Sequence, residues 1–583
     1  MPTRDSASHD PASPRAAGSS RLGDGVIVRG SFGGQPVERR TVLDRAHRGD
    51  VVGAWGTIPL VDTGPRTSGW RRLATFAAVL GPGVIVMVND AGGLSLYAQA
   101  GQDRGYRLLW LVILLAPVLF VNQEMVARLG AVTGVGHARL IFERFGRLWG
   151  RFALADLLVL NALTLVTEFI GIALGCGYFG ISRLVSVPLA AMALVGVTAR
   201  GSFRHWERAM FAALLGTLAV VPLALLVQAH HPALAAAHLA ATRRRPLPTR
   251  GVLFVVAMIG TTVSPWQLFF QQSNVVDKRV TSRWVRYARA DIAVGTLLFV
   301  AGAAAALATC AAALHHVAGA GAGAGGRGGG FVDAEHTAAS LGSAVGAWAG
   351  VLFAVVVLSG SLLGAAAVAL STSYAIGDAS GLRHSLHRPW RQARAFHGSF
   401  LAMIVFAAAV VMIPGLPLGL LTLLVNVLAG VLLPSATVFL VLLCNDRAVL
   451  GPWTNPPWLN VLAAVIVGML IVLSAQLVLT TLFPGLGVPV QVTVALVGLA
   501  GVVGATSALA WVRGPGCGAD LSVGHGAGRS GEDRATWTMP PLETLGQPPR
   551  SRGRRAIVLV LRLYVLLALI LVVIKGMRLL LCF

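Results

Sequence analysis

Long apolar stretches separated by short polar connections make up most of this chain. An apolar run of about 18 residues or more is long enough to cross the hydrocarbon core of a bilayer as a helix. The pattern therefore predicts an all-helical, polytopic membrane protein. The thirteen expected helices cover residues 73–102, 107–129, 151–177, 184–199, 208–228, 251–274, 289–314, 343–374, 396–413, 418–443, 459–481, 488–512 and 556–581.

The polar segments outside these helices divide the chain into parts. Residues 1–70 are rich in Ser, Gly, Arg and Asp and lack an apolar leader segment, which is typical of a disordered cytoplasmic arm. Residues 513–555 are rich in Gly, Arg and Pro, as disordered linkers are. The expected parts are this arm, a ten-helix core in 71–445, two further helices in 446–512, the basic linker 513–555 and a transmembrane or membrane-associated helix in 556–583.

Composition and charge favour a membrane location and argue against a nucleic-acid partner. Only 12% of the 583 residues are charged, against about 25% in soluble domains, and the mean hydropathy is +0.72. The formal net charge of +23 comes mainly from Arg in the termini and between apolar runs, as the positive-inside rule requires. Arg243–Arg245 is the main exception. We expect a monomeric multi-pass protein of the bacterial cytoplasmic membrane, with its N-terminus inside and the lipid bilayer as its surroundings.

Catalytic motifs are missing from the sequence. It contains no Ser-His-Asp set, no Walker-type loop and no HExxH. The five cysteines are scattered without a CxxC pair, so no zinc site or disulfide framework is visible. We therefore expect neither enzymatic activity nor a resident cofactor.

The first expected helix has a polar interruption at mid-depth. Asn89 and Asp90 are followed by Ala91, Gly92 and Gly93. Each glycine destabilises a helix by about 1 kcal/mol, and an ionisable residue inside a membrane marks a functional site by default. Close helix packing is the alternative explanation for the glycines alone.

A second interruption lies in the helix expected over 251–274. Gly260, Thr261, Thr262, Ser264 and Pro265 lie at mid-depth there. Proline removes a backbone donor, and freed backbone groups persist in a membrane only where they line a cavity or find partners. Two interrupted helices, five helices apart, predict two inverted five-helix repeats with a substrate site at the paired breaks.

The residue types at the two breaks favour a hard metal ion. Asp90 offers a carboxylate, the freed carbonyls offer oxygens, and Ser264 offers a hydroxyl. Soft ligands are missing, because no Cys, Met or His lies at either break. Oxygen ligands suit magnesium or manganese, and magnesium retains much of its water shell. Gly93 leaves room for such a hydrated ion.

Three stretches carry a family resemblance. They are "GPGVIVMVNDAGG", "GYRLLWLVILLAPVLFVNQEMVARLGAVTG" and "MIGTTVSPWQLFFQQS". Over about 81–450 the chain resembles the NRAMP family of divalent-metal transporters, which has the LeuT-type fold. The family's first break is Asp-Pro-Gly-Asn. Here Asp90 keeps the metal-binding Asp, while Gly93 stands where the Asn ligand would be.

Further departures from the family pattern share one chemical direction. Ser264 stands in place of the thioether that selects transition metals. Trp266 and Gln271 stand in place of two His residues, the first of which is implicated in proton coupling. The family's Asp three residues before Glu168 is Leu165 here. The substitutions remove soft and protonatable groups, so the chain is most similar to the divergent NRAMP-related magnesium transporters.

Other polar residues near the expected site keep two interpretations. Asn89 either contacts the ion's water shell or caps a half-helix. Thr261 is expected to offer its backbone carbonyl, because the helix should unwind there. Ser264 either contacts a water or bonds its own helix. Asn426 corresponds to a family Gln near the metal. Like Gln267, it either contacts the ion or makes interhelical hydrogen bonds.

Acidic and aromatic residues complete the set of candidates. Glu168 either lines the inner pathway or, when protonated, holds helices together by a hydrogen bond. Glu124 has Arg128 four residues later, a spacing that favours a local structural pair. Trp266 is expected to pack in the place of the missing His.

Together these features predict alternating-access uptake of magnesium, and of manganese, driven by the membrane potential without protons. One alternative is a proton-coupled manganese or transition-metal importer, with Glu168 and Asp156 as the relay. A second is an organic-solute transporter of the same fold, and a third is a metal sensor that does not transport.

Overall fold

The structure is a computed structural model of the 583-residue chain. Asn89 and Asp90 lie outside the residues that it describes, as do most of the expected helix 488–512, most of the expected linker 513–555 and all of the C-terminal helix 556–581. The described residues are 27–32, 35–40, 49–62, 64–88, 91–230, 251–315, 333–416, 418–482, parts of 490–501, 537 and 539–545.

Helices account for nearly all of the described structure. The α-helices are α2 (Gly69–Val79), α3 (Pro82–Val88), α4 (Ala91–Arg104), α5 (Leu109–Thr133), α6 (His137–Phe145), α7 (Arg147–Tyr178), α8 (Arg183–Ala199), α9 (Phe203–Leu218), α10 (Val220–His230), α12 (Gly251–Thr262), α13 (Pro265–Asp277), α14 (Val285–Ala313), α16 (Ala334–Ala344), α17 (Ala347–Ser380), α18 (Arg394–Val411), α19 (Leu418–Cys444), α20 (Arg447–Leu450) and α21 (Pro457–Leu482). Short 3-10 helices are η1 (Gly105–Leu108), η3 (Ser282–Trp284), η5 (Gly451–Trp453) and η6 (Leu542–Thr544).

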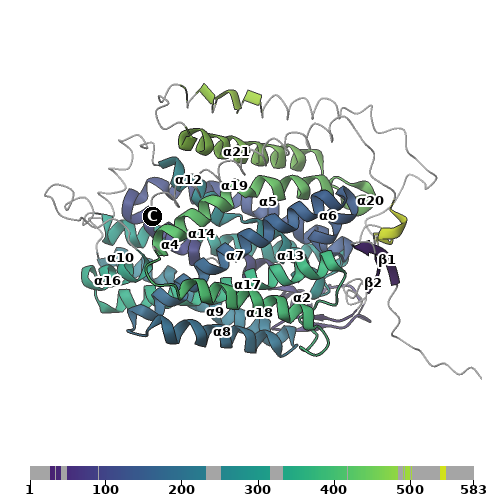
Figure 1. The fold of residues 1–583 in the computed structure, drawn as a ribbon, viewed down its shortest axis with the longest axis horizontal. Helices are drawn as coiled ribbons and strands as arrows, with labels where there is room; N and C mark the ends of the chain where they lie inside the picture. The colour runs from purple at the N-terminus through teal and green to yellow at the C-terminus, as the bar shows by residue number, and fades with distance from the viewer. Residues whose placement is uncertain are drawn as a thin grey trace, which may run out of the picture.

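The long helices lie side by side, roughly along one direction (Figure 1). Helices α10 and α16 mark one end of this bundle, called the α16 end. Helices α6 and α20 mark the other, called the α6 end. Helices α7 and α17 pack along each other inside the bundle, while α21 packs outside against α19.

The expected membrane helices are largely confirmed. Among the described residues, eight helical segments are long and apolar enough to cross a membrane. The pair α2 and α3 forms a further candidate, bent by 52°. Helices α12 and α13, with 12 and 13 residues, are the two halves of one expected helix.

Two short helices were not expected. Helix α6 lies in a segment taken as a loop, and α16 lies mostly in another. Each is far shorter than a membrane span, so a search for long apolar runs passes over it. Asp333 caps α16 by accepting a hydrogen bond from the His336 amide at 2.8 Å.

The expectation of disorder over residues 1–70 is wrong for two hairpins. Strands β1 (Ile27–Phe32) and β2 (Gln35–Arg40) pair antiparallel, as do β3 (Val51–Val52) and β4 (Thr57–Ile58). The β3–β4 turn packs on α9. The Ala54 amide donates to the Glu207 carboxylate at 2.5 Å, and Arg208 Nε donates to Ala54 O at 3.1 Å.

A buried ion pair lies beneath this hairpin at the α6 end. Lys278 Nζ, directly after α13, is 2.5 Å from Glu207 Oε1 on α9, and both side chains are fully buried. The same ammonium donates to Leu80 O at 2.7 Å, where α2 ends. The Lys278 ammonium therefore connects α9 and α13 to the bend between α2 and α3.

The start of α3 is also held by a carboxylate from another helix. Asp291 on α14 accepts hydrogen bonds from the amides of Gly81, Gly83 and Val84, at 3.1, 2.6 and 3.3 Å. These are orphan donors at a helix N-terminus, which favours negative charge. Gly81 has φ +145°, a conformation that L side chains rarely adopt, so the bend before α3 depends on glycine there.

Removing only the cation of the buried pair should be more damaging than neutralising both partners. Lys278→Met leaves the Glu207 charge buried without a counterion, so we expect a loss of about 3–5 kcal/mol in stability. The double variant Glu207→Gln/Lys278→Met keeps an acceptor for the Ala54 amide and should recover much of that loss. The apparent Tm of each purified variant in detergent is the measurement. Equal Tm values for the single and double variants would contradict this account.

Candidate functional site

The second interruption is narrower than the sequence pattern suggested. Helix α12 continues through Gly260 and Thr261 to Thr262, and α13 starts at Pro265. Only Val263 and Ser264 lie between the two helices. The expected unwinding at Thr261 itself is therefore wrong, although the break lies within three residues of it.

Hydrogen bonding at the break explains where the helix ends. A helical carbonyl normally accepts from the amide four residues later, but Pro265 has no N–H to offer to Thr261. The Ser264 hydroxyl donates to Gly260 O at 2.5 Å, while the Ser264 amide turns to Gln267 Oε1 at 3.2 Å. The local interpretation of Ser264 thus holds, and its oxygen can still accept from a water.

The first interruption lies beside the second. Helix α3 ends at Val88 and α4 begins at Ala91, on either side of Asn89 and Asp90. Gly93 and Thr261 line one cavity, together with Val88. The structure thus brings together the two flanks of the paired breaks that the sequence predicted.

A hydrogen bond joins the two half-helices next to this cavity. The Thr262 hydroxyl donates to Met258 O at 2.6 Å, so in the 2.6 Å contact between Tyr97 and Thr262 the tyrosine hydroxyl is the donor. Tyr97 also lines the cavity. The sequence argument missed Tyr97, although its position four residues after Gly93 places both on one face of α4.

Asn426 is brought to the site by close packing of α12 and α19. A Cβ atom at Gly260 would collide with the backbone of Asn426 and Gly430, so these helices touch through glycines. Asn426 Nδ2 donates to Thr422 O of its own helix at 3.0 Å. That bond orients the amide and leaves its oxygen as the acceptor.

Of the described candidates, Gly93 and Thr261 line the cavity, whereas Ser264, Asn426, Glu168, Gln267, Gln271 and Trp266 do not. Trp266 is fully buried, packs against Phe270 and has its carbonyl bonded by Ser371 at 3.0 Å, as expected of a packing residue. Glu168 is fully buried in α7, and Gln271 is fully buried in α13.

A row of neutral amides runs along α13 away from the break. The row consists of Gln267, Gln271 and Asn274, and Lys278 continues it directly after α13. The intervals of four, three and four residues place these side chains within a sector of about 60° on one helix face. Gln123 of α5 donates to Gln267 at 3.3 Å. Within the described structure, both polar side-chain atoms of Gln271 and of Asn274 are buried without a hydrogen-bond partner.

This row defines a polar route from the break to the ion pair at the α6 end. Buried amides without partners cost about 1–3 kcal/mol each, so they favour any movement that lets water reach them. Gln123 and Asn274 were not candidates from the sequence. The i, i+4, i+7 spacing of amides after Ser264 was the signal that could have found Asn274.

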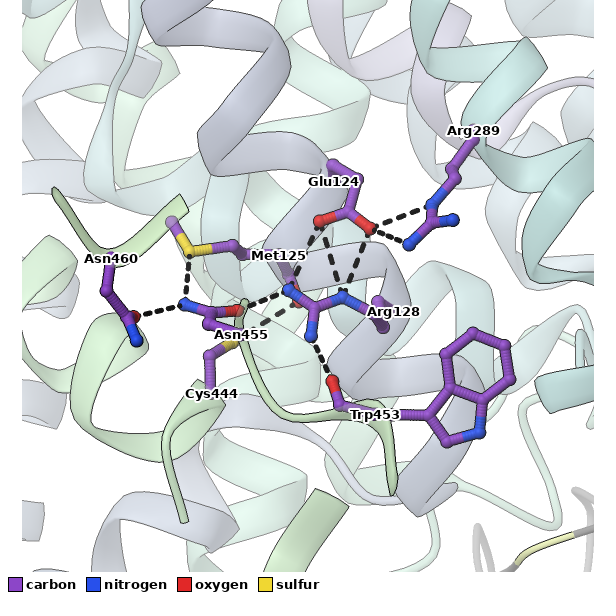
Figure 2. Close-up of polar contacts among 8 residues, drawn as sticks. All are labelled: Glu124, Met125, Arg128, Arg289, Cys444, Trp453, Asn455 and Asn460. Carbon is purple, nitrogen blue, oxygen red and sulfur yellow. Dashed lines mark hydrogen bonds and ion pairs between the residues drawn. The ribbon is translucent and has the colours of Figure 1, made fainter. Parts of the chain in front are cut away.

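Glu124 is structural, as its spacing to Arg128 predicted (Figure 2). Arg128 Nε lies 3.1 Å from one carboxylate oxygen, and Arg289 from α14 lies 2.7 Å from the same oxygen. Arg128 also donates to Asn455 at 2.5 Å and to the Trp453 carbonyl. The Glu124 carboxylate therefore joins α5 to α14, and Arg128 joins α5 to the connection before α21.

A second charged cluster lies where α17 ends and the connection to α18 begins. His384, in the connection between α17 and α18, is 2.9 Å from Asp378. Burial disfavours the imidazolium, but the hydrogen bond and charge of Asp378 outweigh burial and raise the pKa of His384. His137 on α6 bonds Gln272 at 2.7 Å, and burial lowers its pKa to about 4.

The architecture defines a class of protein, namely a multi-pass helical membrane protein of the LeuT type whose two interrupted helices meet inside the bundle. Residues 83–480 match a family model described as Natural resistance-associated macrophage protein-like, or Nramp. The chain belongs to the Nramp family, as its motifs predicted.

Relatives and solved structures agree with this assignment. The chain is 33% identical over 250 residues to the divalent metal cation transporter MntH of Burkholderia ambifaria, covering 41% of this chain and 54% of that one. It is 29% identical over 403 residues to MntH of Ralstonia nicotianae, covering 66% and 86%. A crystal structure of the Eremococcus coleocola manganese transporter has the same fold, with a TM-score of 0.53, 19% identity and coverage of 78% and 96%.

The pairing of His384 with Asp378 predicts a pH-dependent stability difference. A raised pKa means that the stabilisation is complete below about pH 6.5 and is lost as pH rises through the higher folded value. Asp378→Asn should therefore cost about 1–2 kcal/mol near pH 6 and progressively less as the pH rises through the raised pKa of His384. Apparent Tm values of both proteins across this range test this. A Tm difference that grows with pH would contradict it.

Proposed function

We propose that this protein takes up divalent metal ions across the bacterial cytoplasmic membrane, with magnesium as the main substrate and manganese as a second. The observation that carries the proposal is the meeting of Gly93 and Thr261 at one cavity, with Asp90 three residues before Gly93 in the sequence. The described residues contain no group of three or more His, Cys, Asp or Glu side chains able to hold a metal. The Met87 thioether also lines this cavity, and the oxygen donors in the proposal are Asp90, Thr261 and Ser264.

The site chemistry supports an ion that keeps part of its water. Asp90 supplies the charge, and Thr261 supplies its backbone carbonyl oxygen. Ser264, Asn426 and Asn89 contact the ion's water shell, and Gly93 supplies space where a side-chain ligand would displace water. Magnesium, which dehydrates reluctantly, fits such a set better than a soft transition metal does.

The transport mechanism we propose is alternating access by a monomer with its N-terminus inside. The ion enters from the α16 end, binds between the half-helices and leaves along the amide row after α3 and α13 separate. The membrane potential supplies about 4.6 kcal/mol per 100 mV for a divalent cation that crosses fully. Neutral Gln267 and Gln271 and the packing residue Trp266 offer no proton relay, so uptake needs none.

A proton-coupled manganese importer is the second candidate. It is favoured by the relatives, which are named divalent metal cation transporters, and by the solved manganese transporter of the same fold. The buried carboxyl of Glu168 and the half-buried carboxyl of Asp156, which Ser435 bonds at 2.9 Å, would then have to carry the proton.

Removing the Asp90 carboxylate should abolish uptake. In proteoliposomes with an interior-negative potential, Asp90→Ala should lower magnesium and manganese influx at least tenfold, because the ion loses its charged ligand. Asp156→Asn is the matched control, since it removes another carboxyl of the membrane core and should retain influx. A pH dye inside the vesicles should report no acidification with wild-type influx. Unchanged flux in Asp90→Ala would refute the site, and metal-dependent acidification would favour the proton-coupled alternative.

Placing a thioether at the break should shift the selectivity. Ser264→Met removes the hydroxyl and adds a soft ligand, so the ratio of manganese to magnesium influx should rise several-fold. Competition between the two ions in the same vesicles measures this ratio. Ser273→Met, on another face of α13, is the control and should leave the ratio unchanged. An unaltered ratio in Ser264→Met would place this residue outside the metal's reach.

A further inference from the structure

A second cavity lies beside the start of α16. Helices α4, α7, α16 and α19 enclose it, and its lining includes a carboxylate, three hydroxyls and an amide. The polar lining residues are Ser95, Gln99, Thr167, Asp333 and Thr422. Sequence analysis singled out none of them.

The cavity lies along two helices that carry the proposed metal site. Ser95 and Gln99 follow Gly93 on α4 but lie on a different face of that helix from Gly93 and Tyr97. Thr422 precedes Asn426 by one turn of α19, and the Asn426 side chain bonds its carbonyl at 3.0 Å. Because Asn426 also packs against Gly260 of α12, the cavity adjoins the break through α19.

The Ser95 hydroxyl makes no structural hydrogen bond within the described residues. Its side chain is 9% exposed, and no described residue forms a hydrogen bond with its hydroxyl. By contrast, the Thr167 and Thr422 hydroxyls donate to carbonyls of their own helices at 2.7 and 3.1 Å. A nearly buried hydroxyl that lines a cavity without a partner is suited to a ligand or its water.

Asp333 supplies negative charge to the same cavity. It accepts the His336 amide as the cap of α16, a bond that uses one carboxylate oxygen. Among the described residues nothing bonds the other oxygen.

We propose that this cavity is an outer station for a hydrated divalent cation, with Asp333 as its charged ligand. Ser95, Gln99 and the two threonines accept or donate hydrogen bonds to the ion's water shell. The station rests on the proposed metal uptake and deepens it, because it adds a capture step before Asp90. In a chain with a formal net charge of +23, a local carboxylate at the entrance raises the cation concentration that the inner site meets.

Asp333→Asn separates the charge from the structural role of this residue. Asn caps a helix about as well as Asp does, so α16 and the apparent Tm should be preserved. The KM for magnesium and manganese influx should rise about fivefold, while the maximal rate should stay within twofold of wild type. Ser95→Ala should raise KM by about twofold.

Glu335→Gln is the matched control. It removes the same charge two residues away, but Glu335 does not line the cavity and its carboxylate lies beside Gly177 of α7. Its KM should stay within twofold of wild type. If Asp333→Asn leaves KM unchanged, or if both variants raise it equally, the station is refuted.

Binding separates this inference from the proposed function. Calorimetry with Mn²⁺ on purified Asp90→Ala protein should show a residual weak site, and adding Asp333→Asn should abolish it. Wild-type protein that transports no metal would refute the proposed uptake while this binding test still decides on the station. Absence of the residual site in Asp90→Ala, or its persistence in the double variant, refutes the station.

Discussion

Every backbone polar group inside a bilayer needs a partner from the protein, and this constraint governs the break between α12 and α13. Pro265 has no backbone N–H to donate, and the adjacent Ser264 makes two hydrogen bonds at the break. Ser264 bonds Gly260 through its hydroxyl, and its amide turns to Gln267. Thr261 lines the cavity that Gly93 also lines. The proposed metal site is therefore at the place where the hydrogen bonding of the helix ends.

Buried charges fix the parts that surround the break. Lys278 links α9 and α13 to the bend before α3, and Asp291 caps α3 from α14. Glu124 joins α5 and α14 through two arginines (Figure 2). Such pairs are costly to bury and are strongly directional, so they define one arrangement of helices well. The amide row on α13 lacks this kind of partner. Its free energy improves when water enters.

Hydropathy predicts most of the fold, because apolar length is what the bilayer selects. The expected helix 151–177 lies within α7, and 418–443 matches α19 to within one residue. The hairpin of β3 and β4 could not be predicted in this way. Its position depends on Glu207 and Arg208, about 150 residues further along the chain, and no local pattern reports such contacts.

The candidate site was predictable to a similar degree. The paired breaks predicted that Gly93 and Thr261 would meet, since backbone groups freed inside a membrane need a cavity or hydrogen-bond partners. Asp333 could not be found from the sequence, because it follows a glycine-rich loop and lies in no apolar run that would make its charge conspicuous. Tyr97 was hidden for the opposite reason, since an aromatic residue in a membrane helix is expected to pack.

The carboxylates differ in whether a positively charged side chain compensates them. Three of the six buried carboxylates in the described structure have a cationic partner: Glu124 two arginines, Glu207 Lys278 and Asp378 His384. A divalent cation gains nothing from a carboxylate whose charge is balanced. It is attracted where the charge meets only neutral donors, as at Asp333 on its backbone amide. The chain carries a large net positive charge. Because Glu124, Glu207 and Asp378 are paired with cations, the few unpaired carboxylates along the proposed route have the larger effect on a metal ion.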